Sequence, residues 1–198
     1  MRSRARPLAL LALLALCAGC GSASSERTPP QQFRGSELNP PAAAPGFTLR
    51  DDAGRTVSLA AQRGRYVVVT FLYTHCPDVC PVIAGNLNRA LATPVARRAG
   101  LRVLAVSVDP ARDTAAAVRR YVRERGLLPS FRYLIGSRPQ LERVWRAYRV
   151  AAQAGPKSTV THSTFELLVD PQGRERLVYD ATLKTADLVH DLARLEAS

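Results

Sequence analysis

Two cysteines, Cys76 and Cys80, are separated by three residues, a spacing that suits redox chemistry or metal binding. They lie in the segment 74–81 (THCPDVCP), which follows an apolar run and opens a stretch compatible with a helix. Residues four apart share one face of a helix, and this spacing also permits a disulfide. Backbone N–H groups at a helix start favour a thiolate. The pair could therefore be redox-active, hold a soft metal, or form a structural disulfide in an exported protein.

The sequence narrows the choice of metal. Thiolates select Cu(I), zinc or iron–sulfur clusters. Iron–sulfur clusters take four cysteines, and the other two here, Cys17 and Cys20, lie in or beside a leader segment. Structural zinc takes four protein ligands, whereas this chain offers the pair and at most one or two of its 3 His. The single Met is the initiator, so thioether ligands are excluded. Two thiolates and one imidazole would make a three-coordinate site, which suits copper.

Alternating strands and helices must position this pair. The near-continuous apolar run 65–73 predicts a strand buried on both faces, and 101–108 predicts a second one. The further predicted elements are a hairpin of 47–49 and 56–59, helices over 80–92, 114–125 (capped by Asp113 or Thr114), 139–150 and 185–195, and strands over 163–169 and 174–179. This order predicts an α/β domain in which helices flank a mixed sheet. It is the order of a thioredoxin-like fold with an added N-terminal β-hairpin.

Residues 1–19 have the pattern of an export signal. Three arginines precede the apolar stretch Leu8–Ala18, which is shorter than the roughly 20 residues that a membrane-spanning helix needs. The small residues before Cys20 resemble a bacterial lipoprotein signal, in which Cys20 would be lipidated and become the mature N-terminus. Cys17 stands where such signals usually carry Leu. Ordinary secretion with cleavage nearby is the alternative.

A Pro-rich tether over 20–45 follows the signal, and the folded domain is expected over 46–198. We therefore expect an exported protein that a lipid anchors to a membrane on its periplasmic or extracytoplasmic side.

The net charge of +12 does not indicate nucleic-acid binding. All but two of the 28 basic residues are Arg, and they are scattered along the chain without interleaved aromatic residues. We interpret them as a solvated surface that favours anionic partners or an anionic membrane face.

The segment 71–81 (FLYTHCPDVCP) resembles the SCO/SenC family of copper-handling assembly factors for cytochrome c oxidase. The similarity extends over most of 46–198. It includes the opening hairpin (47–49 with Gly54), the segment 107–114 (SVDPARDT), and His162-Ser163 with 168–173 (LVDPQG).

This resemblance implies a thioredoxin-like fold and a copper site formed by Cys76, Cys80 and His162. The metal would be Cu(I), and imidazole also suits Cu(II). The implied function is that of a metallochaperone, more than an enzyme. It would deliver copper to the binuclear centre of oxidase subunit II or another recipient, or reduce the cysteines of that centre. We expect a monomer.

Two other functions stay open. In a thiol–disulfide oxidoreductase acting on an exported partner, Cys76 would attack the partner disulfide and Cys80 would resolve it. Thioredoxins, however, carry two residues between their cysteines and place Pro where this chain has Thr161-His162. A copper- or redox-dependent sensor without a delivery step is the third possibility. For His162 itself, the alternative is an ordinary histidine at a strand start.

Overall fold

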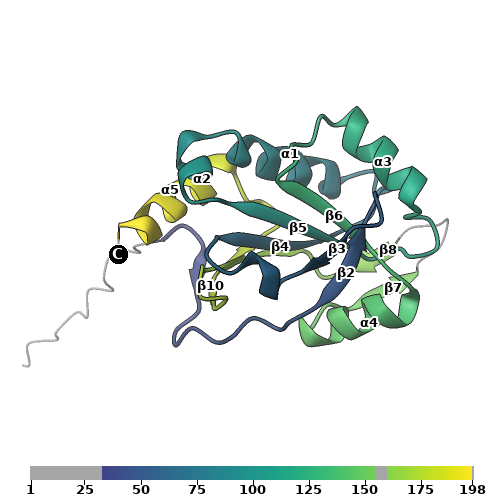
Figure 1. Cartoon of the computed structure of the whole chain (residues 1–198), viewed down its shortest axis with the longest axis horizontal. Coiled ribbons are helices and arrows are strands. Elements are labelled where there is room, and N and C mark those ends of the chain that lie inside the picture. The colour runs from purple at the N-terminus through teal and green to yellow at the C-terminus, as the bar shows by residue number, and fades with distance from the viewer. Residues whose placement is uncertain (1–32, 155–159, 198) are drawn as a thin grey trace, which may run out of the picture. The chain divides into compact units, whose positions relative to one another are not determined.

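A mixed eight-stranded sheet forms the centre of the computed structural model, which describes residues 33–154 and 160–197 except for the side chains of 153–162 (Figure 1). The strand order is β1-β10-β9-β4-β5-β6-β2-β3. The strands are β1 (Ser36–Glu37), β2 (Thr48–Asp51), β3 (Thr56–Ser58), β4 (Val67–Leu72), β5 (Arg102–Ser107), β6 (Phe131–Ile135), β9 (Phe165–Val169) and β10 (Glu175–Asp180). A separate pair joins β7 (Ala152–Ala154) to β8 (Val160–His162).

The middle of the sheet is its most buried part. Strands β4, β5 and β6 are parallel, and β9 joins β4 in the antiparallel sense. Every residue of β4 is buried, as expected for a β-branched apolar run that helices cover from both sides. The carboxyl ends of β4 and β5 therefore open at the same edge of the sheet, where the segments that follow them can meet.

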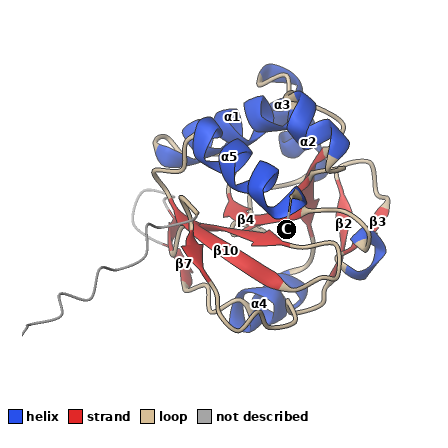
Figure 2. Ribbon diagram, turned by 90° about the vertical axis from the view of Figure 1, so that its left-hand side faces the viewer, coloured by secondary structure: helices blue, strands red, loops and turns tan. Residues whose placement is uncertain are grey.

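Helices cover both faces of the sheet. Figure 2 shows α1 (Val79–Leu91), α2 (Pro94–Arg98), α3 (Ala115–Glu124) and α5 (Thr185–Glu196) on one side and α4 (Arg138–Ala147) on the other. Ile83, Leu87 and Leu91 of α1 recur at helical spacing and are buried. On the opposite face, the indole of Trp145 in α4 donates to the carbonyl of Ser107 at 3.0 Å. Within the described residues, every helix is too short or too polar to cross a membrane.

The structure confirms the predicted α/β class and each predicted helix and strand to within a few residues. It adds elements that the sequence did not predict, namely β1, β6, α2, a short 3-10 helix at Ala60–Gln62, and the β7–β8 pair. Strand β6 extends the parallel part of the sheet and connects it to the hairpin through β2.

Contacts with the folded domain begin before Gly46, the predicted start of that domain. Phe33 is buried, and β1 pairs with β10. The carboxylate of Asp191 in α5 accepts the backbone N–H groups of Arg34 and Gly35 at 2.8 Å each. The segment 33–45 is thus held on the sheet by long-range contacts. The predicted signal over 1–19 and the start of the tether lie outside the described residues.

Candidate functional site

The loop that carries both cysteines connects the buried strand β4 to helix α1. A tight turn forms after β4, where the backbone N–H of Cys76 donates to the carbonyl of Tyr73 at 3.3 Å. Helix α1 begins at Val79, so Cys80 lies in its first turn. Because β4 and the inner face of α1 are both buried, they fix the two ends of this loop.

The two thiols lie side by side and are not joined by a disulfide. The backbone N–H of Cys80 donates to Sγ of Cys76 at 3.5 Å, and the two side chains also share a hydrogen bond. Cys80 is fully buried, whereas Cys76 is partly exposed. A reactant can therefore reach Cys76 first, with Cys80 directly behind it.

The environment shifts the pKa values of the two cysteines in opposite directions. The hydrogen bond from the Cys80 thiol lowers the pKa of Cys76 to about 5, although burial acts in the opposite direction. Backbone N–H groups of Asp78 and Cys80 at the helix start lower this pKa further. The pKa of Cys80 is raised, first by its hydrogen bond to the Cys76 thiolate and then by burial. At neutral pH the site therefore presents one thiolate and one thiol.

Asp113, just before α3, ties the cysteine loop to the edge of the sheet. Its carboxylate accepts the hydroxyl groups of Thr74 (2.7 Å), Ser107 (2.6 Å) and Tyr133 (3.1 Å). Burial raises the pKa of this carboxyl, and these hydrogen bonds oppose the rise. The side chain that caps α3 is that of Thr114, which accepts the N–H of Ala117.

The sequence prediction treated Asp113 only as a possible helix cap and missed this role. The sequence did contain a signal. Asp113 and Thr114 could both cap the same helix, and because a helix start needs only one capping residue, the other was available for a different role.

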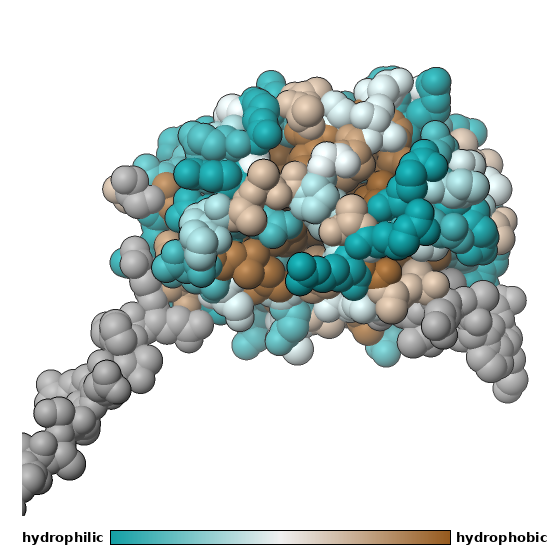
Figure 3. All heavy atoms as spheres, turned by 90° about the horizontal axis from the view of Figure 1, so that it is seen from below, coloured by the Kyte–Doolittle hydropathy of each residue, from teal (hydrophilic) through white to brown (hydrophobic). Residues whose placement is uncertain are grey.

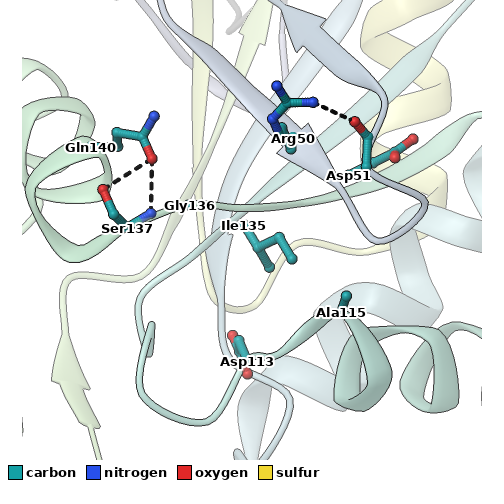
Figure 4. Close-up of a pocket in the computed structure, with 9 residues that line it drawn as sticks. Arg50, Asp51, Asp113, Ala115, Ile135, Gly136, Ser137 and Gln140 are labelled. Atoms are coloured by element: carbon teal, nitrogen blue, oxygen red, sulfur yellow. Dashed lines mark hydrogen bonds between the residues drawn. The ribbon is translucent and has the colours of Figure 1, made fainter.

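A cleft of about 340 Å³ is lined in part by Asp113, the residue that holds Thr74 of the cysteine loop. Figure 4 shows it between the first residues of α3 and those of α4, with Asp113, Ala115 and Ile135 around it. On the α4 side, Ser137 and Gln140 close the helix start with a capping box. The cleft is thus a neighbour of the loop that carries the cysteines.

His162 is described by its backbone alone. It ends β8, where it pairs with Ala152 of β7, and the N–H of Ser163 donates to the carbonyl of Ala151 at 3.1 Å. Strand β9 then begins at Phe165, whose ring lies 5.6 Å from that of Phe71 near the end of β4. The chain therefore passes from His162 to the strand end from which the cysteine loop departs. Its imidazole lies outside the described residues.

Within the described residues, no three His, Cys, Asp or Glu side chains gather in a group that could hold a metal ion. The candidate site so far consists of the Cys76–Cys80 pair and its support. Cys20 also lies outside the described part of the chain.

Other polar residues near the motif play local roles. His75 is exposed, and its Nδ1 is 2.9 Å from the hydroxyl of Thr74. Asp78 is exposed and stands at the N-cap position just before α1, where its side chain makes no capping hydrogen bond. In α5, Nδ1 of His190 lies 2.8 Å from the carboxylate of the buried Asp191.

Comparisons with known proteins identify a family and a fold that this chain resembles. The family model described as SCO1/SenC matches residues 36–197. The mitochondrial protein SCO2 homolog of Bos taurus is 38% identical over 151 residues, which are 72% of this chain and 56% of that protein. The chain thus matches little more than half the length of this curated relative.

Solved structures show the same fold. Copper-bound ScoI of Bradyrhizobium japonicum has a TM-score of 0.68 and 29% identity, with coverage of 77% of this chain and 99% of that one. Apo Sco1 of Thermus thermophilus has a TM-score of 0.70 and 32% identity, with coverage of 82% and 96%.

Proposed function

The chain belongs to the SCO1/SenC family, and on this premise we propose that it is a copper-binding metallochaperone for the binuclear copper centre of cytochrome c oxidase. The observation that carries this proposal is the pair of free, adjacent thiols at the start of α1. Soft thiolates are the ligands that Cu(I) prefers. The copper-bound relative from Bradyrhizobium japonicum gives independent support for this choice of metal.

We assign the metal ligands as Cys76, Cys80 and His162. The thiolate of Cys76 would bind first because it is ionised and accessible, and Cys80 would release its proton as the metal binds. The path of the backbone from β8 into β9 supports His162 as the third ligand. Copper is the cargo, and transfer to oxidase subunit II or another recipient would proceed by exchange of these ligands for those of the recipient.

A titration with Cu(I) against a competing chelator tests this assignment. We expect the reduced full-length chain to bind one copper ion, and His162→Ala to weaken binding. His75→Ala is the matched control, because His75 is next to Cys76 but its imidazole bonds Thr74. A stoichiometry well below one, or equal affinity in the two variants, would contradict the proposal.

The opposite pKa shifts of Cys76 and Cys80 favour a second candidate function, that of a thiol–disulfide oxidoreductase. The Cys76 thiolate would attack one sulfur of a partner disulfide and release the other as a thiolate. The Cys80 thiol would then lose its proton and attack Cys76, which releases the second partner sulfur. The partner gains two electrons while Cys76 and Cys80 become a disulfide. Catalytic reduction of a partner disulfide in the absence of copper would favour this function.

We further propose that residues 1–19 are removed, that Cys20 carries a lipid, and that 21–32 extend the tether to the domain. The protein would then be exported and stand on the outer side of a membrane as a monomer. Metabolic labelling with a fatty-acid analogue tests this proposal. Cys20→Ala should abolish the label, whereas Cys17→Ala should retain it.

A further inference from the structure

A groove of about 300 Å³ brings four guanidinium groups together, far along the sheet from the cysteine loop. It is lined by arginines 55, 65, 102 and 132 with the carboxylate of Asp51. Arg102 begins β5, whereas the cysteines follow the opposite, carboxyl end of the neighbouring strand β4. The groove is therefore separate from the proposed copper site.

Strand register explains why these side chains converge. Arg132 of β6 pairs with Leu104, which lies two residues after Arg102 in β5, so both arginines project from the same face of the sheet. Phe71 and Val106 are paired on that face, and the ring of Phe71 lies 5.6 Å from that of Tyr148, which follows α4. Figure 3 views the molecule from the α4 side and shows strongly hydrophilic residues mixed with apolar patches on this face.

The one carboxylate of the groove is already shared. Oδ2 of Asp51 accepts Nε of Arg55 at 2.8 Å and Nη1 of Arg132 at 3.1 Å. Among the described residues, neither Arg65 nor Arg102 forms a salt bridge, and the guanidinium of Arg102 donates to the carbonyl of Leu101 at 3.2 Å. The groove thus holds a local excess of positive charge.

The positive charges are close enough to oppose one another. Burial, and then the neighbouring charges of Arg65 and Arg132, lower the pKa of Arg102. Like charges that are partly withdrawn from water repel, and a bound anion would relieve this repulsion. The planar guanidinium fork matches the oxygen atoms of a phosphate group.

We propose that this groove is a binding site for a phosphate-type oxyanion, held by Arg65 and Arg102 with help from Arg132. Its volume suits a phosphate monoester or a lipid head group better than a large ligand. The phosphate could come from a free anion or from an anionic phospholipid of the membrane to which the protein is tethered. The site acts independently of copper.

The test measures binding of inorganic phosphate to the copper-free full-length chain by calorimetry, and of phosphatidylglycerol vesicles by flotation. We expect Arg65→Gln/Arg102→Gln to weaken binding about tenfold or more, because each lost contact is a charge-assisted hydrogen bond. The matched control is Arg120→Gln/Arg123→Gln, which removes the same charge from the exposed side of α3. Phosphatidylcholine vesicles control for non-specific membrane binding.

The two arms distinguish the sources of phosphate. Groove-dependent binding of inorganic phosphate alone identifies a free anion, and groove-dependent binding of phosphatidylglycerol identifies the lipid. The proposal is overturned if neither probe binds, or if the groove variant and the α3 variant lose binding equally. Thermal unfolding of both double variants without phosphate checks that they are folded. Because Arg65 is exposed and has no salt bridge in the described structure, we expect both to unfold cooperatively.

Discussion

The carboxylate of Asp113 accepts two hydrogen bonds from Thr74, one from the backbone N–H of Thr74 at 3.0 Å and one from its hydroxyl at 2.7 Å. Thr74 lies two residues before Cys76, so this contact sets where the cysteine loop leaves β4. The same carboxylate accepts the hydroxyl of Ser107 at the end of β5. One buried side chain therefore fixes the proposed ligand loop relative to the sheet.

Asp113→Asn should disturb the site without removing a ligand. An amide keeps the size of the carboxylate but replaces one acceptor oxygen with a donor, so at least one of the bonds to Thr74, Ser107 or Tyr133 is lost. We expect unfolding free energy to fall by about 1–3 kcal/mol and Cu(I) affinity by about 10–100-fold. Denaturant unfolding and competition titration measure the two effects.

The matched control for this variant is Asp109→Asn. Asp109 is also buried before α3, but its carboxylate pairs with Arg112 and makes no described contact with the cysteine loop. Copper affinity in the control should stay close to that of the unchanged chain. Equal affinities in the two variants would show that Asp113 does not position the loop.

Cys80→Ala should make Cys76 less acidic. The largest cause of the low pKa of Cys76 is the hydrogen bond from the Cys80 thiol, which alanine cannot donate. The alkylation rate of Cys76 should rise as its thiol ionises, with a midpoint near pH 5 in the unchanged chain. This midpoint should move upward in the variant. Rates measured between pH 4 and 9, with the modified peptide identified by mass spectrometry, check this expectation.

Val82→Ala is the control for the alkylation experiment, because Val82 is 57% exposed on the same helix. It should leave the midpoint unchanged. An unchanged midpoint in Cys80→Ala as well would contradict the hydrogen-bond explanation.

Glu166 should make folding sensitive to pH. It lies in β9 with 0% exposure, its Oε1 accepts the Thr70 hydroxyl at 3.3 Å, and its Oε2 has no partner among the described residues. Burial raises the pKa of this carboxyl from 4.5 to about 8. Between these values the folded chain keeps a proton that the unfolded chain has lost. Stability should therefore fall as pH rises through this window and level off above it.

Glu166→Gln should remove this pH dependence, because the amide does not ionise. Urea unfolding at pH 5 and pH 8 measures the effect. Between pH 5 and pH 8, the free energy of unfolding should fall in the unchanged chain by on the order of a few kcal/mol more than in the variant. Parallel pH dependences in the two proteins would show that Glu166 does not carry the effect.

The buried strands and their helices could be predicted from the sequence because each has a strong local pattern. Strand β4 is an uninterrupted apolar run, and α1 buries residues at helical spacing. Strand β6 was missed because its five residues include Arg132, which breaks the apolar pattern. The structure explains this arginine by its ion pair with Asp51 on the neighbouring hairpin.

Other features depend on contacts between distant residues. The segment from Phe33 to Pro45 is rich in proline and polar residues, which favours a tether. It packs because Asp191, more than 150 residues away, accepts its backbone N–H groups. Asp113 likewise contacts Thr74 across 39 residues. The cysteine pair, in contrast, could be predicted because its spacing and its position at a helix start are both set within one short segment.

We propose that Cys76, Cys80 and His162 together bind copper. Copper X-ray absorption on the reduced full-length chain and on Cys76→Ala, Cys80→Ala and His162→Ala reports the ligands of the metal. We predict two sulfur atoms and one nitrogen atom around the metal in the unchanged chain. Each cysteine variant should lose one sulfur, and the histidine variant should lose the nitrogen. A first shell without sulfur, or one that His162→Ala leaves unchanged, would contradict the claim.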